Sequence, residues 1–154
     1  MISWLTMVLL LSLQEPHHAM NDRGAKVMGF DQQLTVHHFH LYDDGGAIDI
    51  AVKDAANAAD RDAIRSHLPH IATMFAAGNF EAPMLIHDSA RVPGVALLAA
   101  RRDRIRYTYT ETPNGGRVEI ATTDPSARAA LHQFLRYQIA EHRTGDSTEV
   151  TKRR

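Results

Sequence analysis

Two histidines and an aspartate between residues 35 and 50 have the types and spacing that metal binding needs. His38 and His40 alternate along an expected strand, so their side chains share one face, about 6.6–7 Å apart. Asp49 lies on the next expected strand, across a tight turn. Two imidazoles and one carboxylate are a ligand set for Zn²⁺, Cu²⁺ or non-haem Fe²⁺. The sequence therefore predicts a metal site at His38, His40 and Asp49.

A simpler interpretation needs no metal. The same strand face could be polar only because it faces solvent or a subunit contact, with Asp49 merely accepting a hydrogen bond from His40. The sequence leaves both interpretations open.

A second candidate stripe lies on an expected helix. His67, His70 and Met74 follow i, i+3 and i+7 spacing beside an apolar face, and a thioether with imidazoles favours copper. The alternative is that the stripe forms the edge of the core, with Met74 filling a gap.

An internal repeat positions these residues. The segment DDGGAIDIAVKD (43–54) matches PNGGRVEIATTD (113–124) at an offset of 70 residues, and the helices that follow match at an offset of 67. Each copy, 34–80 and 104–146, predicts two strands joined by a tight turn and then a helix. Asp124-Pro125 is typical of a helix N-cap followed by proline at the first helical position.

These elements predict an α+β fold made of ββα–ββα, a four-stranded, mainly antiparallel sheet with two helices on one face. The alternation of side chains places His37 on the core face and His38 and His40 on the outer face. The expected core stripes of the two helices are Ile64, Leu68, Ile71 and Phe75, and Leu131, Phe134, Leu135 and Gln138.

The turns set the predicted register. Asp44-Gly45 and Asn114-Gly115 are typical of type I′ turns, whose central residues need positive φ. A turn at Asp44-Gly45 would place His40 opposite Asp49 and His38 opposite Ala51. Replacing Asp44 or Asn114 by alanine should then destabilise the protein.

Composition excludes several classes of protein. The chain has 154 residues, a net charge of −1, ten histidines and no cysteine. The charge gives no general attraction to nucleic acid, and disulfides are impossible. We find no phosphate-binding loop, no dinucleotide fingerprint and no hydrolase or zinc-protease motif.

The two ends differ from the rest of the chain. Residues 4–13 are almost uniformly apolar, which is too short to span a bilayer but typical of a signal peptide. We expect residues 1–18 to be a signal peptide or an N-terminal apolar segment, 19–147 a single domain, and 148–154 a disordered basic tail. The expected location is periplasmic or secreted, with no stable membrane span after processing.

Three segments, MGFDQQLTVHHF, RSHLPHIATMFAAGNFEAPMLIHD and FLRYQIAEHRTGD, resemble a group of small exported bacterial proteins of uncharacterised function. Such sequences are sometimes labelled aspartate carbamoyltransferase, although the phosphate loop S-T-R-T of that enzyme is absent here. The resemblance implies export and assigns no catalytic residue.

The sequence thus predicts an exported, non-enzymatic binding domain that uses its outer sheet face, with a transition metal (Zn, Cu or Fe) as candidate ligand. Two alternatives stay open. One is a metal-dependent enzyme with a two-histidine, one-carboxylate site. The other is a module without metal that forms a homodimer through the sheet face.

Overall fold

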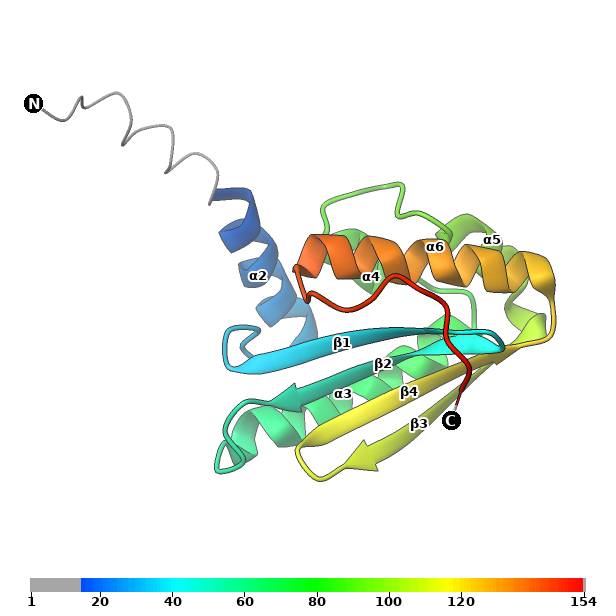
Figure 1. Ribbon diagram of the computed structural model, residues 1–154. Helices are drawn as coiled ribbons and strands as arrows, with labels where there is room; N and C mark the ends of the chain where they lie inside the picture. The colour runs from blue at the N-terminus through cyan, green and yellow to red at the C-terminus, as the bar shows by residue number, and fades with distance from the viewer. Residues whose placement is uncertain (1–14, 154) are drawn as a thin grey trace, which may run out of the picture.

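A computed structural model describes residues 15–153 and has the predicted α+β architecture, a four-stranded antiparallel sheet with helices packed on one face (Figure 1). None of the helices in this part of the chain combines the length and hydropathy needed to cross a membrane. The expected signal peptide falls largely on residues 1–14, outside the described residues. The helices are α2 (Glu15–Met28), α3 (Ala58–Ala76), α4 (Glu81–Ile86), α5 (Val95–Ala100) and α6 (Pro125–His142), with a 3-10 turn η1 (Arg102–Arg104), and the strands are β1 (Thr35–Tyr42), β2 (Gly45–Val52), β3 (Ile105–Thr112) and β4 (Gly115–Thr122).

The two repeats meet in the middle of the sheet. The strand order is β1-β2-β4-β3, so the second strand of each repeat pairs with the other. The helices then cross over. Helix α3 of the first repeat packs on β3 and β4, whereas α6 of the second packs on β1 and β2. The helix of each repeat therefore covers the hairpin of the other.

Alternation along the strands builds the core as predicted. Ile48 and Ile50 of β2 and Val118 and Ile120 of β4 are buried beneath the helices. All eight residues expected on the two helical core stripes are also buried: Ile64, Leu68, Ile71, Phe75, Leu131, Phe134, Leu135 and Gln138.

Helix α6 begins where the sequence predicts. The Asp124 carboxylate accepts hydrogen bonds from the backbone N–H groups of Ser126 (2.8 Å) and Ala127 (3.1 Å), with Pro125 at the start of the helix. These bonds lower the pKa of Asp124. Helix α3 is capped by Asn57 and continues through Pro69.

The predicted hairpin register is wrong by one step. Tyr42 pairs with Gly45 and Thr112 with Gly115, so the two turn residues are Asp43-Asp44 and Pro113-Asn114. His38, not His40, lies opposite Asp49, and His40 lies opposite Ala47. The inward and outward faces are nevertheless as predicted. Each residue pairs with a partner two positions from the predicted one, and residues two apart on a strand share the same face.

The type I′ premise is also wrong. Among the described residues other than glycine, only Asp88 and Arg143 have positive φ, so alanine at Asp44 or Asn114 meets no left-handed strain. The glycines after each turn are needed for a different reason. A Cβ on Gly45 would lie 1.9 Å from the Ile120 carbonyl oxygen, and one on Gly115 would lie 2.0 Å from that of Ile50. The two central strands approach too closely there for any side chain.

The second glycine of each pair lies against a helix. A Cβ on Gly46 would lie 2.4 Å from a methyl carbon of Leu135, and one on Gly116 would lie 3.0 Å from a methyl carbon of Leu68. Leu68 and Leu135 are equivalent residues of the two repeats. In each Gly-Gly pair, the first glycine thus allows the close contact between β2 and β4, and the second allows the contact with a helix.

Gly115→Ala should lower the free energy of unfolding by about 2 kcal/mol or more, because the added methyl group overlaps backbone that cannot move independently. Urea unfolding followed by circular dichroism measures this. Gly29→Ala is the control. Gly29 has a φ of +81° but no neighbouring atom within 4 Å of an added Cβ, so only left-handed strain of about 1 kcal/mol is expected. Equal losses in the two variants would contradict the close-approach argument.

Candidate functional site

His38, His40 and Asp49 share the outer face, as predicted, but they do not form a common site. The His40 Nε2 atom lies 2.8 Å from an Asp49 carboxylate oxygen, a diagonal contact between β1 and β2. The His38 and His40 rings lie 6.4 Å apart between centroids. His38 points to a different carboxylate, that of Asp146. The contact between His40 and Asp49 is the one that the metal-free interpretation expects.

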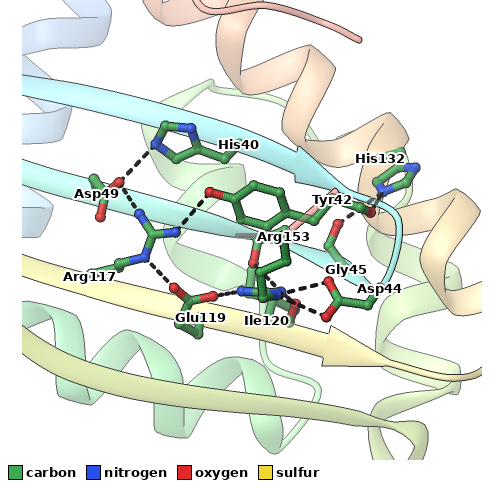
Figure 2. Close-up of polar contacts among 11 residues, drawn as sticks. His40, Tyr42, Asp44, Gly45, Asp49, Arg117, Glu119, Ile120, His132 and Arg153 are labelled. Atoms are coloured by element: carbon green, nitrogen blue, oxygen red, sulfur yellow. Dashed lines mark hydrogen bonds and ion pairs between the residues drawn. The ribbon is translucent and has the colours of Figure 1, made fainter. Parts of the chain in front are cut away.

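Asp49 belongs to a chain of charged side chains across the outer face (Figure 2). Its carboxylate accepts a hydrogen bond from Arg117 Nη1 at 2.5 Å, and Arg117 lies directly opposite it on β4. Arg117 also pairs with Glu119, and Glu119 pairs with Arg153. We call His40, Asp49, Arg117, Glu119 and Arg153 the outer-face ladder.

The ladder weakens the case for a metal at Asp49. His40 and Arg117 already contact one oxygen of this carboxylate, and the fixed positive charge of the guanidinium would repel a cation. The third partner of that guanidinium, after Asp49 and Glu119, is the Tyr42 hydroxyl, which accepts from Nη2 at 2.9 Å. Sequence reasoning missed Arg117 and Tyr42 as partners of this group because no local pattern links β1 to β4.

His38 is oriented by a residue 108 positions away. Its Nδ1 lies 2.8 Å from Asp146, whose other carboxylate oxygen accepts from the Phe39 backbone N–H at 2.9 Å. Burial alone would raise the pKa of Asp146, but hydrogen bonds from Thr144, Phe39 and His38 outweigh it and lower the pKa. The segment after α6 thus binds the edge of β1 through Asp146.

The three residues of the second predicted stripe, His67, His70 and Met74, lie in different surroundings. The His67 ring packs edge-on against Phe30 at 5.8 Å between centroids, whereas His70 is exposed and Met74 is half-buried. Burial, and then the charge of His70, lower the pKa of His67 to about 4. His67 therefore joins a different group.

Four histidines from separate elements meet between the sheet and the helices. We call His37, His67, His87 and His142 the histidine cluster; they come from β1, α3, the residue after α4, and α6. The rings of His37 and His142 are stacked at 5.5 Å, and His87 meets His142 edge-on at 5.1 Å. Phe30 links His37, at 6.0 Å, to His67. Sequence spacing offers no signal for this group, which only the tertiary fold assembles.

The cluster is electrostatically unusual. Burial, and then the nearby His67 and His38, lower the pKa of His37 to about 4. The pKa of His87 is also lowered, chiefly by burial, although the hydrogen bond to Gln138 and the charge of Glu141 act in the opposite direction. These imidazoles are neutral at neutral pH, and a neutral imidazole is the form that binds metal ions.

Two ring nitrogens of the cluster lack a hydrogen-bond partner within the described part of the chain. The His87 Nε2–H donates to the Gln138 side-chain oxygen at 3.0 Å, so the lone pair lies on Nδ1. That Nδ1 is buried without a hydrogen bond, the His87 side chain being only 1% exposed. His37 Nε2 is likewise buried and unpaired. Buried polar atoms are nearly always paired, so two of them in one cluster need an explanation.

A hollow of 240 Å³ adjoins the cluster. Its lining includes His37, His142, His38 and Thr144. Of the two unpaired imidazoles, His37 lines this hollow and His87 does not. An unpaired, neutral imidazole beside a hollow is typical of a functional site. In residues 15–153, however, no three histidine, aspartate or glutamate side chains converge closely enough to hold a metal ion.

Comparison of the chain with protein-family models, curated proteins and solved structures found no match. The resemblance to small exported bacterial proteins therefore stays a prediction. The arguments for function rest on the geometry of this chain alone.

The lowered pKa values predict acid sensitivity. His37 titrates near 6.5 when unfolded and near 4 when folded, so the unfolded chain binds protons first as the pH falls. The free energy of unfolding should therefore be fully present above about pH 6.5 and should fall between pH 6.5 and 4. His37→Phe, which keeps an aromatic ring, should reduce this fall, as measured by urea unfolding at several pH values.

His18→Gln on the exposed surface of α2 is the matched control and should leave the fall unchanged. The argument fails if His37→Phe loses as much stability on acidification as the unmodified chain does.

Proposed function

We propose that this protein is a binding domain without catalytic activity of its own, and that its ligand is a transition metal ion taken up by the histidine cluster. The observation that carries the proposal is the pair of buried ring nitrogens without partners, His37 Nε2 and His87 Nδ1. A bound ion in contact with such a lone pair would satisfy it, and His142 lies between the two rings.

The surroundings of His87 support a metal ligand. Ligand histidines commonly donate their second ring N–H to a fixed acceptor, which sets the tautomer. Gln138 does this for His87, and it projects from the same helix as His142. The Glu141 carboxylate lies 3.9 Å from the unpaired Nδ1 and would add a negative charge. Imidazoles with one carboxylate suit Zn²⁺, Cu²⁺ or Fe²⁺.

Binding would require the rings to move. His37 and His142 are stacked face to face, 12° from parallel, so their nitrogens do not yet point to one centre. The adjoining hollow is lined by His37 and His142 and gives these two rings room to rotate about their side-chain bonds. We therefore expect the ion to change the ring contacts rather than enter a finished cage.

The outer face supplies a second candidate, at His38 and His40. Each of these rings is held by one carboxylate through one nitrogen, Asp146 for His38 and Asp49 for His40. Asp49 would then orient His40 instead of binding the ion. We place this site second because Arg117 lies against Asp49.

The remaining alternatives have less support. A metal-dependent enzyme would need room for a substrate beside the ion, and the hollow at the cluster is only 240 Å³. A homodimer through the sheet face would bury the outer-face ladder, whose charges already pair with one another.

Export is part of the proposal. We expect a mature chain that begins near residues 14–20. A start before Met20 would preserve the packing of α2, because the Met20 side chain is buried in the core. Intact-mass measurement of protein from the native envelope determines the start, and a cytoplasmic protein that retains Met1 would contradict export.

Calorimetric titration with Zn²⁺ and Cu²⁺ tests the metal proposal, with protein purified without a histidine tag. His37→Phe/His142→Phe should abolish binding, because two imidazoles are replaced by rings of similar shape. Gln138→Leu should raise the dissociation constant about 10-fold or more, as the loss of an orienting partner commonly does.

His40→Ala on the outer face does not line the hollow; it is the matched control and should bind like the unmodified chain. Loss of binding in this control with retention in the cluster variant would assign the ion to the outer face. Absence of binding by the unmodified chain would refute the metal function.

A further inference from the structure

Thr151, within the stretch 148–154 whose composition predicts disorder, pairs with the edge of β1. The Thr151 N–H donates to the Leu41 carbonyl oxygen at 3.0 Å, and the Thr151 carbonyl oxygen accepts from the Asp43 N–H at 2.9 Å. Thr151 thereby forms a parallel bridge with Tyr42. The end of the chain occupies the edge of the sheet as a short additional strand would.

Two residues further on, Arg153 enters a cage on the outer face (Figure 2). Its Nε lies 2.9 Å from both carboxylate oxygens of Asp44, and its guanidinium carbon lies 4.6 Å from the centroid of the Tyr42 ring. The guanidinium also pairs with Glu119 and donates to the Ile120 carbonyl oxygen at 3.1 Å.

This cage has the chemistry of guanidinium recognition. It offers an aromatic face, two carboxylates and a backbone carbonyl, which together match a planar cation with five N–H donors. An ammonium group cannot reproduce these contacts. The cage is also fixed in place. His132 of α6 lies 2.9 Å from the carbonyl oxygens of both Tyr42 and Gly45 and so holds the turn that carries Tyr42 and Asp44.

The cage occurs only once in the repeated fold. At the equivalent positions of the second repeat, Thr112 replaces Tyr42 and Asn114 replaces Asp44, so the ring and the carboxylate are both missing. The repeat alone therefore does not account for the cage. Tyr42 and Asp44 are found only in the first hairpin.

The stretch that leads into the cage is held at few points, whereas Thr151 and Arg153 make the contacts described above. Residues 147–150 are exposed, and among them the Thr148 carbonyl oxygen accepts from Arg136 at 3.2 Å. Segments with few buried contacts open at low free energy while the rest of the domain stays folded. A competing segment could then take the same place.

We propose that the β1 edge, with Tyr42, Asp44 and Glu119, is a recognition site for an extended, arginine-bearing segment of a partner protein, and that the chain's own residues 151–153 occupy it until the partner displaces them. Strand addition at the edge would supply affinity, and the cage would select arginine two residues beyond the paired position. The acidic cage fits a basic segment. This inference is independent of the metal proposal.

Fluorescence anisotropy with a labelled peptide of residues 147–153 tests the site in the full chain. The Arg153→Ala variant, whose cage is vacant, should bind the peptide at least 10-fold more tightly than the unmodified chain. Adding Tyr42→Leu or Asp44→Asn to this variant should weaken binding at least 10-fold. A peptide with lysine in place of Arg153 should also bind at least 10-fold more weakly, and equal binding of the two peptides would overturn the proposal.

A second measurement does not depend on any variant. In the unmodified chain, a large excess of the peptide should shift the backbone amide resonances of Thr151 and Arg153 to the positions of a free segment, while those of β3 stay unchanged. Resonances of Thr151 and Arg153 that do not respond would show that the segment cannot be displaced, and the recognition site would be rejected.

Discussion

The close approach of β2 and β4 is the constraint on which the rest of the structure depends. Gly45 and Gly115 let the two backbones meet, and Gly46 and Gly116 let Leu135 and Leu68 press onto the strands. The same pairing sets Asp49 directly opposite Arg117, so the outer-face ladder depends on the same strand contact as the core. A change at the central strands would disturb both faces of the sheet.

Much of the fold could be predicted because its signals are local. Alternation along the strands assigned the two faces, and Asp124-Pro125 fixed the start of α6. The register failed because Gly45 and Gly115 were assigned to the turns, whereas they are required by contacts with the other repeat. The crossing of the helices could not be predicted, since it depends on packing between residues far apart in the chain.

For the candidate sites too, local patterns predicted some features, whereas contacts between distant residues could not be predicted. The shared face of His38 and His40 followed from strand geometry, but their partners Asp146 and Arg117 come from distant elements. The histidine cluster was hidden for the same reason. His37 was recognised as core-facing, yet nothing in the spacing of His87 or His142 indicates that these rings meet it. The disorder expected of residues 148–153 rested on composition, which gives no information about the cage that receives Arg153.

The exchange of helices makes the two repeats depend on each other. Each helix packs mainly on the hairpin of the other repeat, so a single ββα unit in isolation would expose much of the apolar face of its sheet. Two identical units related by a two-fold axis would bury exactly these surfaces against each other, each lending its helix to its neighbour. The architecture is therefore the one that a two-fold homodimer of a single ββα unit would have, contained in one chain. The two halves are not identical, because Tyr42 and Asp44 in one half correspond to Thr112 and Asn114 in the other.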